Sequence, residues 1–141
     1  MFYRFVATDL TIHFICFICF ILIPTTNIRP EIPGNTLSEK ILALVYSLDG
    51  GNSPSNLFPS IHCYVSWMCW KGVEGSENVP KWYQRFSLVF AILIIISTQV
   101  LKQHYIVDAA AALLLVEFFW RFYQKGQRHK WVVHIFANEK K

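Results

Sequence analysis

Four apolar runs separated by polar segments make up the hydrophobic pattern of this chain. The first run, residues 5–23, contains a single charge, and as a helix it would be about 28 Å long, close to the thickness of a bilayer core. Three further runs predict helices over residues 58–73, 83–101 and 105–123. We therefore predict an all-α membrane helix bundle, a single domain with about four transmembrane helices and a basic tail over residues 124–141.

The first polar segment carries the signals of a short helix of its own. Thr36 and Glu39 have the spacing of a capping box. Apolar residues then recur at helical spacing, namely Leu37, Ile41, Leu44, Val45 and Leu48. This pattern predicts a short amphipathic helix that lies on the membrane surface in the first outer loop. Gly, Asn and Ser are abundant in residues 49–56, which predicts a loop there.

The composition agrees with a membrane protein. Hydrophobic residues make up 54% of the chain and charged residues 16%, with a mean hydropathy of +0.35, which is too apolar for an ordinary soluble domain. The basic residues alternate with the apolar runs instead of lining one helix, which excludes a nucleic-acid-binding face. The four cysteines lie in apolar runs, where we expect them to pack as small hydrophobic residues; a redox pair at Cys16 and Cys19 is the alternative.

The distribution of Lys and Arg predicts the topology. With four spans, ten of the 13 basic residues fall on the side of the two termini, and Arg29, Lys40 and Lys102 fall on the other side. The positive-inside rule then places both termini in the cytoplasm. The same assignment brings segments 24–58 and 97–104 together on the extracytoplasmic face.

The second of these segments leads into a pair of chemically useful side chains. If the last run is helical from about residue 104, His104 and Asp108 lie one turn apart on one face. The carboxylate would then accept one imidazole N–H and leave the lone pair of the other nitrogen free for chemistry. The alternative interpretation is a polar cap at the end of a membrane helix.

The end of the first outer segment has the features of an anion site. Pro59 suits the first position of a helix, where an N–H is not needed. The amides of Ser60, Ile61 and His62 would have no intrahelical partner, and together with the helix dipole they would attract a phosphate.

Two further ion pairs are predicted inside the spans. Asp9 and His13 are four residues apart in the first run, where we expect them to satisfy one another within the bundle; a proton relay is the alternative. Glu117 and Arg121 have the same spacing near the end of the last run and are expected to pair.

The two outer segments resemble the motifs of the type 2 phosphatidic acid phosphatase superfamily, integral membrane lipid phosphatases related in fold to vanadium haloperoxidases. The family patterns are Lys-x6-Arg-Pro, Pro-Ser-Gly-His and Ser-Arg-x5-His-x3-Asp. Residues 59–62 resemble the second pattern, and residues 97–108 keep the spacing of the third, whereas only Arg29-Pro30 remains of the first. Residues 102–105 resemble the branch that includes inositol-phosphorylceramide-synthase-like proteins.

Three positions depart from the family patterns. Leu22 stands in place of the lysine and Thr98 in place of an arginine, so two cations expected around the phosphate are lost. Ile61 replaces a glycine, which is tolerable if the group used there is the backbone N–H. Family members commonly have six spans, so a four-span chain corresponds to a member without the first two helices.

The resemblance implies a mechanism without metal or cofactor, acting on a lipid phosphate in the membrane. His104 would attack phosphorus to form a phosphohistidine, Asp108 would orient its ring, and His62 would protonate the leaving group and then activate water. The phosphate would be bound by residues from all three motifs and the loop between the last two spans, namely Arg29, Ser60, Ile61, Ser97 and Lys102. For Lys102, snorkelling to lipid head groups is the alternative role.

Three other interpretations remain open at this point. A head-group transferase, in which an acceptor hydroxyl replaces water, would use the same residues. A non-catalytic relative is suggested by the two missing cations. A metal site built from His62, His104 and Asp108 has no fixed ligand spacing to support it.

Overall fold

The computed structural model of this chain describes residues 1–49, 55–125, 128 and 130–137, and its regular structure there is helical. The helices in chain order are α1 (Phe2–Leu22), α2 (Leu37–Leu48), α3 (Ile61–Val73), α4 (Lys81–Val100), α5 (Ile106–Gln124) and α6 (Lys130–Ala137). Within the described residues no strand forms, and a single isolated bridge joins Thr26 to Ser55. The all-α prediction is confirmed.

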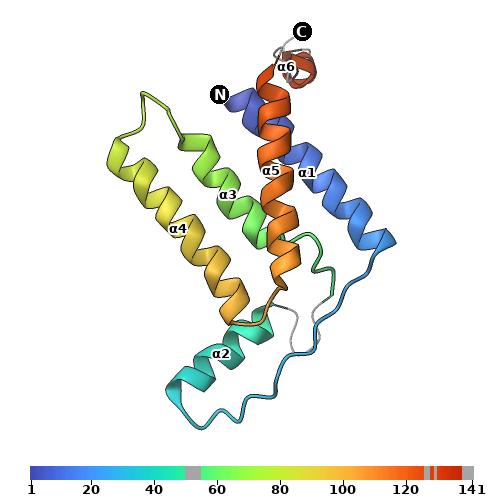
Figure 1. Ribbon diagram of the computed structural model, residues 1–141, viewed down its shortest axis with the longest axis vertical. Helices are drawn as coiled ribbons and strands as arrows, with labels where there is room; N and C mark the ends of the chain where they lie inside the picture. Colours follow the sequence, from blue (N-terminus) through green and yellow to red (C-terminus); the bar gives the residue numbers. More distant parts are fainter. Residues whose placement is uncertain (50–54, 126–127, 129, 138–141) are drawn as a thin grey trace.

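Helices α1, α3, α4 and α5 run along the bundle, and the start of α1 and helix α6 lie at the end opposite α2 (Figure 1). Helix α3 packs against α4 and α5, and α5 also packs against α1. The buried core between α1, α3 and α5 consists of Ile12, Cys16, Cys63, Tyr64, Met68, Ala109, Ala112, Val116 and Trp120. The small side chains of Ala109 and Ala112 allow α5 to approach its neighbours closely. Cys16 and Cys63 pack in this core as expected, whereas Cys69 is exposed, and all four cysteines are free.

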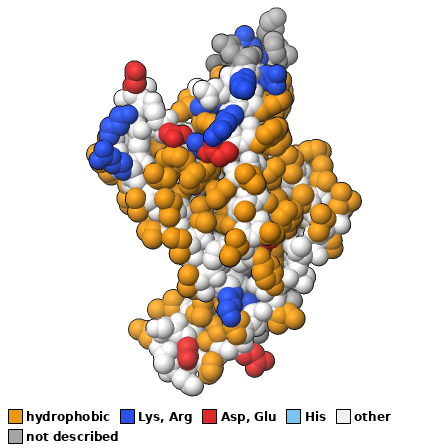
Figure 2. All heavy atoms as spheres, in the orientation of Figure 1, with side chains coloured by type: hydrophobic (Ala, Val, Ile, Leu, Met, Phe, Trp, Pro, Cys, Tyr) orange, Lys and Arg blue, Asp and Glu red, His pale blue; other side chains and the backbone are white. Residues whose placement is uncertain are grey.

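Among the described residues, α1 and α4 are long and apolar enough to cross a membrane. Large apolar side chains on both helices face outward, among them Phe14, Phe17, Phe90 and Leu93. Figure 2 shows hydrophobic side chains over the middle of the visible face, with charged side chains gathered toward its two ends. Helix α3 has 13 residues and α5 carries three charged residues, so these two helices do not meet the same criterion. That α3 and α5 also cross the membrane stays a prediction.

The amphipathic helix of the first outer segment is confirmed as α2. Thr36 and Glu39 form both hydrogen bonds of the capping box, with Thr36 Oγ1 accepting the Glu39 amide at 3.2 Å and Glu39 Oε2 accepting the Thr36 amide at 3.0 Å. Leu37, Ile41, Leu44 and Leu48 are exposed on one face. The Tyr46 hydroxyl donates to the Leu101 carbonyl at 2.9 Å and anchors α2 across the end of the bundle (Figure 1). That α2 lies on the membrane surface stays a prediction.

The start of α3 differs from the prediction. The helix begins at Ile61, with Ser60 as its N-cap, so Pro59 lies outside the helix and follows a cis peptide bond from Phe58. The Ser60 hydroxyl accepts the Cys63 amide at 3.3 Å. Serine is one of the preferred N-cap residues, and its cap moves the helix start two residues beyond the proline.

Residues 124–141 were predicted as a basic tail, and part of this tail forms α6. Val132 of this helix is fully buried and packs with Ala7 of α1 and Tyr123 of α5. The sequence signal for this helix was the helical spacing of apolar residues at Trp131, Val132 and Ile135. Of the predicted loop 49–56, residues 50–54 lie outside the described residues.

Both predicted ion pairs within the spans are present. His13 Nδ1 lies 3.5 Å from Asp9 Oδ1, and the Tyr64 hydroxyl of α3 lies 2.6 Å from the same ring nitrogen. Arg121 Nη2 lies 3.4 Å from Glu117 Oε2, and Lys71 of α3 lies 2.9 Å from the other oxygen of this carboxylate. Glu117 therefore joins α5 to α3 as well as pairing along its own helix.

Candidate functional site

The turn between α4 and α5 presents His104 at the foot of α5. Lys102 has a φ of 51°, in the left-handed region, and this lets the chain reverse between the two helices. The amides of Gln103 and His104 both donate to the Thr98 carbonyl at the end of α4, at 2.9 and 3.3 Å. These contacts hold the backbone of the turn from which the His104 side chain projects.

His104 and Asp108 are close together, as their spacing predicts. His104 Nδ1 lies 3.6 Å from Asp108 Oδ2, and both side chains are 5% exposed. The Asp108 carboxylate also accepts the Tyr105 amide at 2.9 Å, a cap at the start of α5 that holds the carboxylate in place. At 3.6 Å from Asp108, His104 Nδ1 has no hydrogen-bond partner; the tautomer that turns an Nδ1–H toward the carboxylate places the lone pair of His104 on Nε2.

The second histidine comes from α3 and faces that lone pair. His62 Nδ1 lies 3.3 Å from His104 Nε2, and the ring planes are inclined by 60°. The two motifs are joined by a main-chain hydrogen bond, because the Ser60 amide donates to the Asp108 carbonyl at 3.2 Å. The His62 side chain is 48% exposed, whereas that of His104 is almost fully buried. His104 is thus enclosed by the protein, whereas His62 is open to solvent.

The surroundings keep His104 neutral. Burial lowers its pKa below the ordinary value of 6.5, and a positive charge on His62 would lower it further, while Asp108 and Asp49 act in the opposite direction with smaller effect. A neutral imidazole with a free Nε2 lone pair is the form that a nucleophilic histidine needs.

Arg29 is buried against the end of α2, and its guanidinium forms an ion pair with the Asp49 carboxylate. It also donates to the Asp49 carbonyl at 3.1 Å and lies 4.6 Å from the centre of the Tyr46 ring. Sequence reasoning assigned Arg29 to the phosphate and did not single out Asp49. An acidic residue at the end of the amphipathic helix, in the same outer segment as the arginine, was the available signal.

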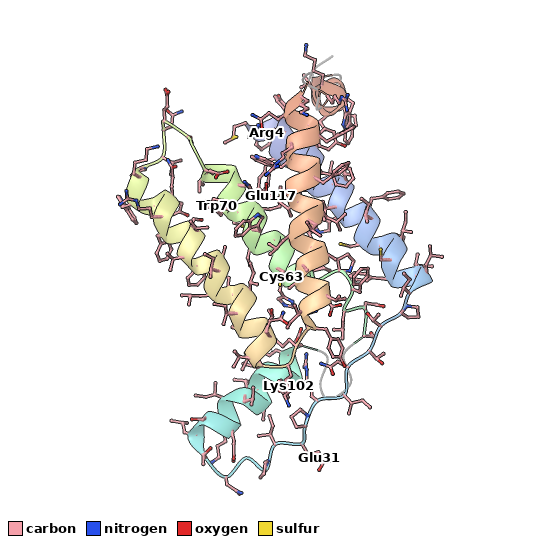
Figure 3. The ribbon with its side chains drawn as sticks, viewed as in Figure 1. Arg4, Glu31, Cys63, Trp70, Lys102 and Glu117 are labelled. Carbon is pink, nitrogen blue, oxygen red and sulfur yellow. The ribbon has the colours of Figure 1, made fainter. Side chains whose placement is uncertain are left out.

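Two cavities open on either side of His104. One, of about 360 Å³, is lined by Phe20, Leu48, Asp49, Ser55, Asn56, Leu57, Ile61, His62 and His104. The other, of about 480 Å³, is lined by Asn27, Ile28, Gln99, Lys102, His104, Tyr105 and Ile106. Lys102 lies at the turn between α4 and α5 next to α2, at the opposite end of the bundle from Arg4 and Glu117 (Figure 3). Ile61 and His62 thus line the first cavity, Lys102 lines the second, and His104 lines both.

The family model of the PAP2 superfamily matches residues 1–121 of this chain. The chain belongs to the PAP2 superfamily. No curated protein and no solved structure matches it in the same comparisons. The superfamily predicted from the motifs is thus confirmed, while the inositol-phosphorylceramide-synthase-like branch stays a prediction.

The three positions that depart from the superfamily motifs lie in different surroundings. Thr98 is buried against Cys63, with 3.6 Å between Thr98 Oγ1 and Cys63 Sγ, so it faces the interior of the bundle. Leu22 is exposed at the end of α1. Ile61 lines the cavity that holds both histidines, and as the first residue of α3 its amide has no acceptor within the helix.

Two other predicted phosphate ligands have their polar groups engaged elsewhere. The Ser97 hydroxyl donates to the Ile94 carbonyl at 2.8 Å, and Ser97 lines neither of the two cavities beside His104. The Ser60 amide and hydroxyl bond to Asp108 and Cys63 as described above. Within the described residues, no group of three or more His, Cys, Asp and Glu side chains is placed to hold a metal ion.

Proposed function

We propose that this PAP2 superfamily member is a membrane-embedded phosphatase that hydrolyses a lipid phosphomonoester or diphosphate on the extracytoplasmic face. The observation that carries the proposal is the buried His104–Asp108 pair, with His104 Nε2 facing the exposed His62 inside a cavity. Two imidazoles in different surroundings supply a nucleophile and a proton donor near neutral pH.

In the first step the Nε2 lone pair of His104 forms a bond to phosphorus. The bond from phosphorus to the leaving oxygen breaks, its electron pair stays on that oxygen, and the oxygen takes a proton from His62. Asp108 stabilises the positive charge that develops on the His104 ring, from 3.6 Å away. The products are a phosphohistidine and the released alcohol or phosphate.

In the second step His62, now neutral, takes a proton from water. The water oxygen bonds to phosphorus, and the N–P bond breaks with its electron pair returning to His104 Nε2. Inorganic phosphate leaves, and both histidines regain their starting states. No group outside the chain and water is required for this balance.

The phosphate is held by the start of α3 and by Lys102. The amides of Ile61 and His62 have no acceptor within the helix, and the positive end of the helix dipole lies beside His104. Lys102 lines the second cavity beside His104 and adds one positive charge. Arg29 contributes less than its family position implies, because Asp49 offsets its charge.

A lipid substrate agrees with the apolar part of the site. Leu48 lies on the exposed apolar face of α2 and also lines the cavity with the histidines, next to Phe20 and Leu57. An acyl or isoprenyl chain in the outer leaflet therefore has an apolar route from the bilayer to the phosphate position.

The test is phosphate release by the purified full chain from phosphatidate, an isoprenyl diphosphate and a sphingoid phosphate. His104→Ala should abolish turnover and any acid-labile phosphoenzyme. His129→Ala is the matched control, since His129 lies beyond the matched residues 1–121. Adding diacylglycerol or ceramide as acceptor separates the alternative head-group transferase, which would form a new phospholipid instead of phosphate. A phosphoenzyme that persists in His104→Ala would refute the assignment.

A further inference from the structure

Four side chains from three parts of the chain form a row across the site. Their order is Asp49, His62, His104 and Asp108. The distances along it are 3.9 Å from Asp49 Oδ1 to His62 Nε2, 3.3 Å between the two imidazoles and 3.6 Å from His104 Nδ1 to Asp108 Oδ2. Asp108 belongs to a superfamily motif, whereas Asp49 belongs to none of the three. Each histidine thus has its own carboxylate.

The Asp49 carboxylate is fixed by donors on one of its oxygens. Arg29 Nη2 and Gln103 Nε2 both contact Oδ2, the latter at 3.1 Å. The Asp49 amide donates to the Val45 and Tyr46 carbonyls at the end of α2, each at 3.2 Å. With Oδ2 occupied and the backbone held, Oδ1 is the oxygen that faces His62.

Counting protons along the row shows what the second carboxylate does. At 3.9 and 3.6 Å the two outer contacts are longer than hydrogen bonds, and His104 Nδ1 has no hydrogen-bond partner. When these contacts shorten to hydrogen bonds, each carboxylate accepts an N–H from its histidine, and the contact between the two rings uses one N–H and one lone pair. The row is therefore satisfied by three protons on four ring nitrogens, which is one positive charge shared by the two histidines. If both rings were neutral, one of the three contacts would lack its proton.

Of the two rings, the exposed His62 is the one at which water can solvate a positive charge. His104 is buried and its pKa is lowered, whereas the His62 side chain is 48% exposed and can be solvated. The charged groups around the two rings are Asp49 with its partner Arg29, Asp108, and Lys102 in the neighbouring cavity. Of these, Asp49 is the negative group next to His62.

We propose that Asp49 is the positioning residue for His62, holding it as the protonated general acid once it has turned away from His104. This inference depends on the proposed function above. A gap of 3.3 Å between the rings leaves no space for a phosphorus atom and its leaving oxygen in line, so His62 has to turn when substrate enters. Catalytic hydrogen bonds are often long in a free enzyme and tighten in the complex, and 3.9 Å to Oδ1 is a distance of this kind.

The first arm of the test compares leaving groups. Asp49→Asn should slow hydrolysis of an alkyl phosphate by about tenfold or more, within the roughly 10²–10⁴-fold that general acid catalysis supplies. Hydrolysis of a nitrophenyl phosphate, whose leaving group needs no proton, should change by less than about threefold. In a His62→Ala background, Asp49→Asn should cause no further increase in the ratio of the nitrophenyl rate to the alkyl phosphate rate. Equal losses on both substrates would overturn the proposal and give Asp49 a purely structural role.

The controls separate charge from folding. Glu31→Gln makes the same carboxylate-to-amide change in the same outer segment, on an exposed side chain that points away from the site (Figure 3), and should leave both rates unchanged. Asp49→Glu keeps the carboxylate and should retain part of the alkyl phosphate activity. If Asp49→Asn does not fold, the double variant Arg29→Met/Asp49→Asn, which removes both charges of the buried pair, takes its place in the same comparison.

The second arm does not depend on turnover. The ¹⁵N signals of the His62 ring are measured in the full chain with orthovanadate as the phosphate mimic. An Nε2–H bonded to a carboxylate is expected in the wild type and in Glu31→Gln, and it should be lost in Asp49→Asn. Identical His62 spectra in the wild type and Asp49→Asn would overturn the proposal. If the coupling is present but no lipid phosphate is hydrolysed, the proposed function fails and the pairing of Asp49 with His62 stands.

Discussion

Replacing Arg29 with methionine tests whether this arginine chiefly stabilises the outer segment or binds phosphate. Its side chain is 0% exposed and pairs with Asp49, and it donates to the Asp49 and Tyr46 carbonyls at 3.1 and 3.4 Å. Loss of one partner from a buried ion pair costs about 3–5 kcal/mol. Asp49 is 26% exposed, so water partly stabilises the remaining carboxylate and we expect the lower end, about 3 kcal/mol.

The buried thiols provide the assay. Cys16 and Cys63 are buried in the core, so a thiol-reactive fluorophore reaches them only when the helices separate. A Cys69→Ser background removes the exposed thiol and its early signal. A loss of about 3 kcal/mol in Arg29→Met should lower Tm by on the order of 10 °C.

Two comparisons make the result specific. Lys40→Met removes an exposed basic residue of the same outer segment and should change stability by no more than about 0.5 kcal/mol. The double variant Arg29→Met/Asp49→Asn removes both charges and should recover much of the loss. A loss below about 1 kcal/mol in Arg29→Met, together with a more than tenfold weaker inhibition by phosphate, would show that the arginine serves the ligand.

Four further results are expected. The acid limb of kcat/KM should lie below pH 6.5, because burial lowers the pKa of His104. The free energy of unfolding should also fall as the pH drops below about 6.5, because the unfolded chain then binds a proton at this histidine more readily than the folded chain does. Lys102→Gln should raise KM about fivefold to tenfold with kcat within about twofold, a modest effect because the lysine is exposed; an unchanged KM would indicate snorkelling. Thr98→Arg should destabilise the protein by about 1–3 kcal/mol without adding phosphate affinity, because Thr98 is buried against Cys63; tighter phosphate inhibition would contradict this placement. A cysteine at Asn35 should react with an impermeant reagent added outside intact cells and one at Ser76 should not; the reverse labelling would place the site in the cytoplasm.

The parts of the site that follow from short-range geometry could be predicted from the sequence. His104 and Asp108 come together because a four-residue separation at the start of a helix puts two side chains on one face. The capping box of α2 follows from the same local rule. Membership of the PAP2 superfamily also followed from motif spacing, since the two histidine motifs lie within the matched residues.

The parts of the site that depend on how the outer segment packs against the helix bundle could not be predicted from the sequence. The start of α3 was misplaced because Pro59 suits a first helical position, whereas the Ser60 hydroxyl provides the actual cap. The pairing of Arg29 with Asp49 joins residues 20 apart, around a helix whose docking depends on a hydrogen bond from Tyr46 to the α4–α5 turn. No periodicity in the sequence encodes a contact of that kind.

That one contact changes the electrostatics of the whole site. From the sequence, we assigned Arg29 and Lys102 to the phosphate as its cations. Two family cations are missing, because Leu22 and Thr98 stand in their places. In the structure Arg29 is offset by Asp49, so the exposed Lys102 and the start of α3 remain as the positive features beside His104. In our proposal His62, held by the Asp49 carboxylate, supplies a further positive charge at the phosphate. The residue that offsets the arginine is thus the same residue that, in our proposal, maintains the charge of the acid.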